Sequence, residues 1–295
     1  MARSVAAALP WGLRALWLVL PFTAGSALAA ALDGASVPVR TTTSVGAWLA
    51  WALVVLALLV PHPVGLTVLR VVAPAVVAAS LWAATSGEAG LGEMTSALVT
   101  SSLAAALAFL PETGTWMVNG AAYGDERRHL LRPPAALLAG PVPLAWAGLV
   151  ASIAAGPLLL AAGKEVAGAL ALVVGAPVAV VLARALHSLT QRWAVLVPAG
   201  LVVKDHLTVL DPVLLRRADI EVLRPAPAGS EALDLTAGAT GLPLEARLHE
   251  AVPLVRVRPG RHRQGEPGRS AALRFTPSRP GAVLAEARRR RIATG

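Results

Sequence analysis

The sequence predicts a membrane all-α helical bundle of about six spans, followed by a small, mainly β domain that ends in a helix. Hydrophobic residues make up 56% of the 295 residues, charged residues only 15%, and the mean hydropathy is +0.64. A typical soluble domain carries about 25% charged residues, so this chain lacks the charge that water contact requires. Residues 1–187 contain nine Lys or Arg and seven Asp or Glu, whereas residues 188–295 contain 17 and 10. We therefore expect a transmembrane bundle over 1–187 and a basic, water-exposed domain over 188–295.

Six apolar segments are long enough, or nearly so, to cross a bilayer. Its hydrocarbon core is about 30 Å thick and requires about 20 apolar residues in a helix. The segments lie at about 11–32, 45–60, 64–85, 95–110, 135–156 and 166–187. Pro61-His62-Pro63 separates the second from the third so tightly that these two should form a helical hairpin.

The first segment has two interpretations. Arg3 before it and the small residues from Ser26 to Ala30 resemble a cleavable signal peptide. However, the apolar stretch that begins at Trp11 is longer than a signal peptide needs. The length favours an uncleaved helix.

Arginine placement predicts the orientation, because short cytoplasmic loops carry an excess of Lys and Arg. Arg3, the loop from Asp125 to Arg132 and the basic C-terminal domain all fall on one side of a six-span protein. We expect that side to be the cytoplasm, with the chain in the plasma membrane. Arg40 and Lys164 are the exceptions, since both are expected outside.

The pattern after residue 187 changes to short apolar runs broken by turn residues, which is typical of strands. The expected strands are 193–197, 201–204, 207–210, 213–215, 220–223, 243–248, 254–257 and 271–275. Pro259 to Ser270 is rich in Arg, Gly and Pro and is expected to be a mobile loop. Ser278-Arg279-Pro280 predicts a final helix over about 280–291, and residues 190–295 should fold without the bundle.

Three of these segments carry a resemblance to a known family. They are the strand Trp193–Val197, the hairpin sequence Gly200–Asp205, and Phe275–Pro280 leading into the last helix. Short strands closed by one helix, directly after membrane spans, resemble the bacterial pleckstrin-homology-like domains. The resemblance implies a small β-sandwich or barrel that binds a protein partner or the inner leaflet. The N-terminal part resembles multi-pass membrane proteins of GC-rich bacteria, which implies no activity.

Catalytic, metal and cofactor signatures are missing from the sequence. The chain has no cysteine, and none of its six histidines lies three or four residues from another. No phosphate-binding glycine loop or serine-nucleophile motif is present either. We therefore predict no catalytic residue, no metal site, no cofactor and no enzyme. A small transporter or channel with a cytoplasmic regulatory domain is the alternative, although the predicted spans have no central Asp, Glu, Lys or His.

Two charged clusters are candidate interaction sites. The first lies in the loop after the fourth span and contains Tyr123, Asp125, Glu126, Arg127 and Arg128. Its carboxylates could pair with arginines of the C-terminal domain; the simpler interpretation, which we favour, is a solvated loop. The second is the run Arg288, Arg289, Arg290 and Arg291, which is either a solvated helix end or a contact for anionic lipid headgroups. Nucleic acid is not expected, since the soluble part has few aromatic residues for base stacking.

Overall fold

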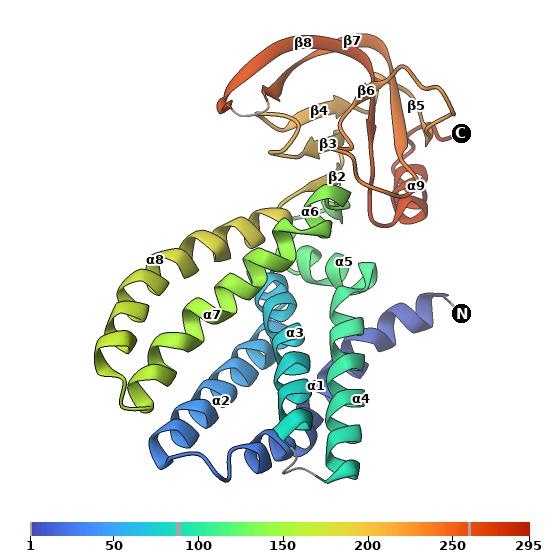
Figure 1. The fold of residues 1–295 in the computed structure, drawn as a ribbon. Coiled ribbons are helices and arrows are strands. Elements are labelled where there is room, and N and C mark those ends of the chain that lie inside the picture. Colours follow the sequence, from blue (N-terminus) through green and yellow to red (C-terminus); the bar gives the residue numbers. More distant parts are fainter. Residues whose placement is uncertain (1, 87–89, 259–260) are drawn as a thin grey trace. The chain divides into compact units, whose positions relative to one another are not determined.

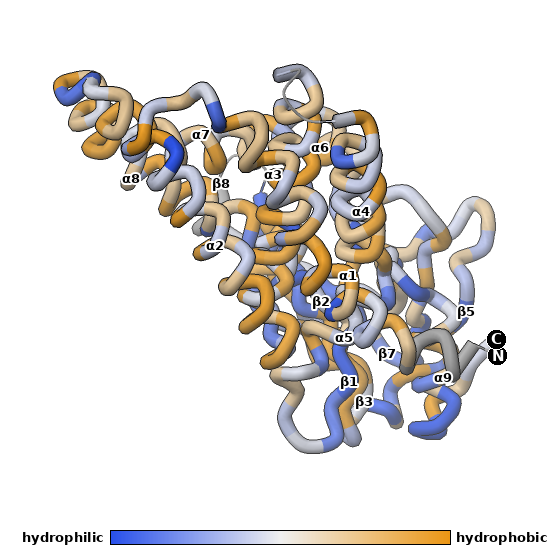
Figure 2. The backbone as a smooth tube through the Cα atoms, turned by 90° about the horizontal axis from the view of Figure 1, so that it is seen from below, coloured by the Kyte–Doolittle hydropathy of each residue, from blue (hydrophilic) through white to orange (hydrophobic). Residues whose placement is uncertain are grey.

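The computed structural model describes residues 2–86, 90–258 and 261–295, and these form two compact units. The helical unit contains Met1–Gly120 and Pro143–His187, and the β unit contains Ala121–Val142 and Ser188–Gly295. The β unit therefore includes a segment that precedes the last two long helices. Figure 1 shows the course of the chain, and Figure 2 shows how hydrophobic residues follow the long helices.

The helical unit is built on helices that are long and apolar enough to cross a membrane. Six qualify among the described residues, and the chain is a multi-pass membrane protein by this measure. The helices of the unit are α1 (Ala2–Ala31), α2 (Val37–Leu59), α3 (Pro63–Ser86), α4 (Leu91–Phe109), the short α5 (Pro111–Asn119), α7 (Pro141–Ala161) and α8 (Glu165–Leu189). The second and fourth spans are longer than their apolar runs alone predicted.

The fifth span starts later than predicted. Residues Ala135–Ala139 form a separate short helix, α6, and α7 begins at Pro141. Gly140 has φ −154° and ψ −59°, which is not helical. Proline cannot donate a backbone hydrogen bond to the preceding turn but is well suited to the first turn of a helix. The prediction from composition placed one span across this apolar stretch, but the backbone breaks between α6 and α7.

Helices α1 to α4 share one apolar core. α1 packs on α3 and α4, and the residues that it buries include Leu13, Trp17 and Leu20. Small residues such as Ala73, Ala97 and Ala104 let the helices approach closely, as is usual in membranes. α1 therefore contributes a large part of the core of the helical unit.

The β unit consists of two four-stranded sheets and a closing helix. The first sheet has the order β1-β2-β3-β4 and is antiparallel throughout, with β1 (Arg127–Leu130), β2 (Trp193–Val197), β3 (Gly200–Lys204) and β4 (Val213–Arg216). The second has the order β5-β7-β8-β6, with β5 (Ile220–Pro225), β6 (Leu233–Asp234), β7 (Leu244–Arg258) and β8 (Arg261–Phe275). Helix α9 covers Pro280–Arg289. The sheet-rich region with a final helix agrees with the predicted fold class.

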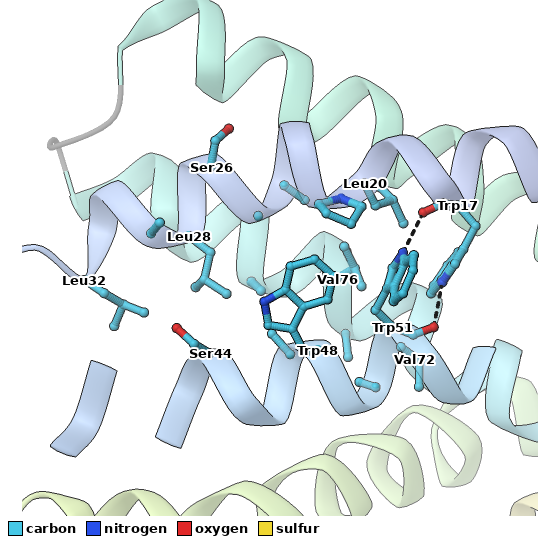
Figure 3. A pocket seen from close by; sticks show the side chains of 18 residues that line it. Trp17, Leu20, Ser26, Leu28, Leu32, Ser44, Trp48, Trp51, Val72 and Val76 are labelled. Atoms are coloured by element: carbon cyan, nitrogen blue, oxygen red, sulfur yellow. Dashed lines mark hydrogen bonds between the residues drawn. The ribbon is translucent and has the colours of Figure 1, made fainter. Parts of the chain in front are cut away.

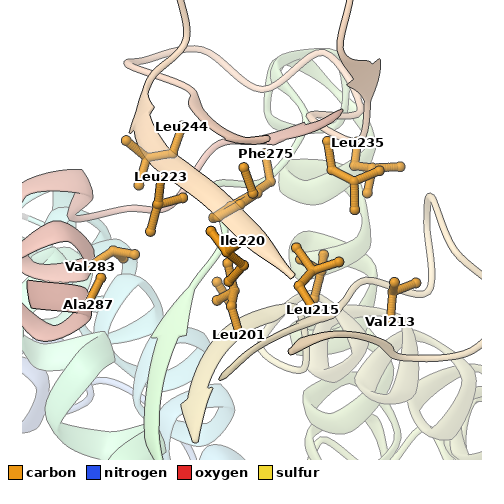
Figure 4. Close-up of a cluster of buried hydrophobic side chains, with 14 of the residues drawn as sticks. Leu201, Val213, Leu215, Ile220, Leu223, Leu235, Leu244, Phe275, Val283 and Ala287 are labelled. Atoms are coloured by element: carbon orange, nitrogen blue, oxygen red, sulfur yellow. The ribbon is translucent and has the colours of Figure 1, made fainter. Parts of the chain in front are cut away.

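Residues from both sheets and α9 meet in one hydrophobic core (Figure 4). Leu201 and Val203 are fully buried, whereas Val202 and Lys204 are partly exposed, as strand alternation predicted. Helix α9 contributes Val283, Leu284 and Ala287 to this core. The predicted face of the last helix is therefore confirmed.

Three predictions for the β unit were wrong. Residues 207–210 form a turn rather than a strand, and only Val209 makes an isolated bridge, to Arg256. The predicted loop 259–270 belongs mostly to strand β8, where pairing with β7 outweighs its Gly and Pro content; Pro259 and Gly260 lie outside the described residues. Residues 127–130 were predicted to be a loop and form the edge strand β1.

Candidate binding surface of the β unit

The segment before β1 is a tight turn that holds the only tyrosine in an exposed position. The backbone N–H of Tyr123 donates to Oε1 of Glu126 at 2.7 Å, and Gly124 has φ +57°, a conformation that suits glycine. The Tyr123 side chain is 91% exposed. Burial alone would raise the pKa of Glu126, but the hydrogen bonds from Tyr123 and Arg128 outweigh it and hold this pKa below its usual value.

Asp125 contacts Arg290, the residue that follows α9, as one of the two sequence interpretations proposed. Nη2 of Arg290 lies 3.2 Å from Oδ1 of Asp125, and its Nε lies 2.9 Å from Oε1 of Glu286. Arg290 is thus held between two carboxylates. Glu126 does not take part, because its ion pair is with Arg128, two residues along the chain. The segment is therefore not a purely solvated loop.

The other arginines of the C-terminal cluster differ in their surroundings. Nε of Arg288 donates to Oγ1 of Thr294 at 2.9 Å, and Arg289 forms an ion pair with Glu286. Arg291 is exposed at φ +57°, just after the helix. Two of the four arginines in the predicted headgroup contact, Arg289 and Arg290, are therefore already paired with acidic residues of the unit.

Two cations enclose the ring of Trp193 on the first sheet. Cζ of Arg128 and Nζ of Lys204 each lie 4.7 Å from the ring centroid, in the range of cation–π contacts. The register explains this, because Trp193 pairs with Leu130 on one side and with Lys204 on the other. The pairing of β1 with β2 was not predicted from the sequence, so this cluster was not predicted either. Arg127 is exposed, and its Nη1 donates to the Glu126 carbonyl.

A buried ion pair fixes the start of the first sheet. Nε and Nη2 of Arg192 each lie 2.7 Å from a carboxylate oxygen of Asp205, and both side chains are at most 1% exposed. Nη1 of Arg192 donates to the Arg132 carbonyl at 2.9 Å. The backbone N–H of Leu207 donates to Oδ1 of Asp205 at 3.0 Å. This network joins β1, β2 and the turn after β3.

A second basic feature of the unit is the outer part of the β7–β8 hairpin. We call residues 252–258 and 261–272 the hairpin arm, which begins after a register shift between Arg247 and Val252 (Figure 1). The arm has one acidic residue, Glu266, and five arginines, namely Arg256, Arg258, Arg261, Arg263 and Arg269. Arg256 pairs with Glu266 at 3.2 Å, and both are about half exposed. The arm was not predicted from the sequence, because most of β8 was expected to be a loop.

Among the residues that the structure describes, the outer edge of β8 is unpaired along most of the arm. β6 pairs with β8 only at Leu233–Leu273 and Asp234–Arg274. An unpaired strand edge invites pairing with another chain unless charge or proline blunts it. Pro267 and Arg269 lie on this edge, so they would hinder strand addition from a partner.

The described residues include no group of three or more His, Asp or Glu side chains that could hold a metal ion. His129 is buried beneath α9, and neither ring nitrogen has a hydrogen-bond partner. Burial lowers the pKa of His129 to about 4; Glu286 opposes the shift, and Arg279, Arg289 and Arg127 add to it. This imidazole is therefore neutral near pH 7.

A pocket of about 490 Å³ lies within the helical unit, between α1, α2 and α3. Its lining is mainly alanine, valine, leucine and tryptophan side chains, with Ser26 and Ser44 as the hydroxyl-bearing members. This lining does not have the ionisable groups that ion or proton pathways through membranes use.

No protein-family model, no curated protein and no solved structure shows detectable similarity to this chain. The candidate surfaces therefore have to be interpreted from their own chemistry. They comprise the Asp125–Arg290 contact, the Arg128–Trp193–Lys204 cluster and the hairpin arm.

Proposed function

We propose that the chain is a non-enzymatic, multi-pass protein of a bacterial plasma membrane whose β unit is a cytoplasmic, pleckstrin-homology-like module for anionic headgroups of the inner leaflet. The hairpin arm carries this proposal: its five arginines and one glutamate give a formal net charge of +4. A basic side chain close to an anionic leaflet contributes about 1 kcal/mol of attraction. The C-terminal arginine cluster supports the proposal less, since Arg289 and Arg290 already pair with Glu286.

Two sheets followed by a closing helix are the architecture that the pleckstrin-homology-like resemblance implies. The pairing of β1 with β2 supports the proposed topology, because α7 and α8 lie between these strands in the sequence. An even number of crossings returns the chain to the side it left. The Asp125–Arg132 segment and the C-terminal domain would then share the cytoplasmic side.

Transport is the weaker candidate. A transporter places polar or ionisable groups around a central site, often beside broken helices. The pocket of about 490 Å³ in the helical unit is instead lined mainly by apolar side chains. Binding of a protein partner by the arm is the second binding candidate; among the described residues the outer edge of β8 is unpaired along most of the arm, but Pro267 and Arg269 there disfavour strand addition.

A label on the arm tests the headgroup proposal in the full chain. The chain has no cysteine, so Ala271→Cys, at an exposed position of the arm, gives a unique attachment site for a fluorophore. The protein is placed in nanodiscs of phosphatidylcholine, with or without phosphatidylglycerol, containing a trace of lipid with a nitroxide on its headgroup. We expect strong quenching only with phosphatidylglycerol. It should weaken as salt rises, because exposed charges are screened within about 8–10 Å.

Charge variants supply the control. Arg258→Gln with Arg269→Gln should shift the arm–surface equilibrium about thirtyfold, since each charge contributes about fivefold. The matched change, Arg216→Gln with Arg217→Gln, removes two exposed arginines outside the arm and should leave the quenching intact. The headgroup function would be rejected if quenching were equal in the two membranes, or equal in the arm variant and the matched control. An arm that stays unquenched everywhere would favour a protein partner.

A further inference from the structure

The pocket between α1, α2 and α3 has one closed end and one polar end (Figure 3). At the closed end, the indole N–H of Trp17 donates to the Trp51 carbonyl at 3.2 Å, and that of Trp51 donates to the Trp17 carbonyl at 2.9 Å. This reciprocal pair locks α1 to α2 and leaves both indole donors satisfied. Nothing polar remains unpaired at this end, so it suits hydrocarbon.

Trp48 forms the middle of the pocket. Its ring stands edge-on to Trp51, with centroids 5.4 Å apart and planes at 83°. The Trp48 side chain is 56% exposed, and among the described residues its N–H has no hydrogen-bond acceptor. In Figure 3 the indole nitrogen is turned toward the end of the pocket where Ser44 lies. A tryptophan with an apolar body and a free donor is typical of the boundary between acyl chains and headgroups.

The polar end combines a hydroxyl with a cation. Ser44 is exposed, and in the described structure its hydroxyl has no partner. Arg40 lies four residues earlier on α2, which places it on the same face of the helix, one turn closer to the α1–α2 connection. Arg40 is exposed and has no ion pair with any described residue, including the exposed Asp33 of that connection. Donors therefore follow one another from Trp48 through Ser44 to Arg40.

The length and volume of the pocket suit an acyl chain of a lipid from one leaflet. The pocket extends along α1 from Trp17 to Leu32, about 22 Å at 1.5 Å per residue. One leaflet contributes about 15 Å of hydrocarbon. The volume of about 490 Å³ lies within the usual range of small-molecule sites. Because α1, α2 and α3 are all membrane-spanning candidates, the opening would face lipid in a bilayer.

We propose that this pocket binds one acyl chain of a bilayer phospholipid, with Arg40 and Ser44 contacting its phosphate and the Trp48 N–H its ester carbonyl. The apolar lining selects the chain, and the positive charge at the mouth selects an anionic head. The mouth is at the α1–α2 connection, so the lipid belongs to the leaflet opposite the N-terminus, which the arginine distribution predicts to be the outer one. This site is independent of the function proposed for the β unit.

Pocket-filling variants test the site by native mass spectrometry of the delipidated full chain after titration with phosphatidylglycerol. We expect one phosphatidylglycerol to bind more tightly than any other. Ala75→Phe on α3 projects into the pocket and displaces at least two methylenes, each contributing about fourfold in affinity, so binding should weaken about tenfold or more. Ala78→Phe is the matched control: the same helix and the same change, at an exposed position outside the lining. It should bind like the unchanged chain.

Ala47→Phe on α2 provides a second pocket-filling variant at an exposed position, in case Ala75→Phe disturbs folding. Arg40→Gln should weaken phosphatidylglycerol binding about fivefold and leave diacylglycerol, which has no phosphate, unchanged. Inorganic phosphate alone should not compete. The inference is wrong if the unchanged chain retains no single tight lipid, or if Ala78→Phe loses the lipid as readily as Ala75→Phe. An Arg40→Gln variant that binds both lipids normally would overturn the phosphate contact.

Discussion

Replacing Asp205 by Asn removes the counter-charge of a guanidinium that has no access to water. Arg192 and Asp205 are at most 1% exposed and are joined by two hydrogen bonds of 2.7 Å. Removing one partner of such a pair usually costs 3–5 kcal/mol, because the remaining charge stays buried without compensation. Asn can still accept one of the two hydrogen bonds, so we expect a loss near the lower limit, about 3 kcal/mol.

Hydrogen exchange in the full chain, in detergent, measures this loss where it occurs. A destabilisation of about 3 kcal/mol should speed exchange of the protected amides in β2 and β3 by about 150-fold. The effect should extend to β1, because Arg192 also donates to the Arg132 carbonyl. Peptides from the helical unit serve as an internal reference within each sample.

Two further variants test whether the loss of stability comes from the unpaired buried charge. Asp211→Asn is the matched control, since Asp211 is exposed, and it should change exchange in these strands very little. The double change Arg192→Met with Asp205→Leu removes both charges and should recover most of the stability, because a buried pair replaced by apolar groups is often tolerated. A change in exchange of less than about fivefold in Asp205→Asn, or a double variant as unstable as Asp205→Asn, would refute a role for the unpaired buried charge.

Three other changes have expected outcomes. Because of His129, the β unit should become less stable as the pH falls from 6.5 toward 4. The histidine of the unfolded chain takes up a proton near pH 6.5 and that of the folded chain only near pH 4, so the free energy of unfolding should fall by about 3 kcal/mol. Urea unfolding at several pH values should show this, and His129→Leu should abolish it. Gly200→Ala should destabilise the first sheet by about 2 kcal/mol or more, because Gly200 has φ +153° and a Cβ there would lie 2.0 Å from the Leu215 carbonyl oxygen. A wild-type exchange rate in β3 of that variant would contradict this. Asp125→Asn should lower the free energy of unfolding by less than about 1 kcal/mol, since Asp125 is 73% exposed. A shift in the thermal unfolding temperature as large as that of Asp205→Asn would contradict this.

Short sequence patterns predicted the structure correctly wherever it depends on residues that are close together in the sequence. Apolar runs identified the six long helices, because a span must present hydrocarbon along its whole length. Alternation predicted that Leu201 and Val203 face the core, and helical spacing predicted the buried face of α9. Helix ends were predicted less well: α2 begins at Val37 rather than at about 45, and α7 begins at Pro141 rather than at about 135, because that apolar stretch contains a helix break.

Pairing between distant segments was decided only by the tertiary structure. The strand β1 is separated from β2 by two membrane-spanning candidates, and nothing in its own composition specifies that pairing. A fragment of residues 190–295 would therefore lack this edge strand and the Arg132 carbonyl that accepts from Arg192. The candidate sites depend on the same long-range placement. Asp125 meets Arg290 across 165 residues of chain, and Lys204 meets Arg128 through Trp193.

Composition determined that this protein has apolar helices and a basic, water-exposed domain, since each residue's preference for lipid or water is local. Composition did not determine which of the positive charges are available to bind a partner. Pairing with β7 gathers arginines on an extended hairpin arm, while Glu286 neutralises part of the conspicuous arginine run at the C-terminus. The pocket between α1, α2 and α3 likewise exists only because three separate helices pack around it. Contacts between residues far apart in the chain require the whole fold, and a sequence pattern read in short windows does not contain them.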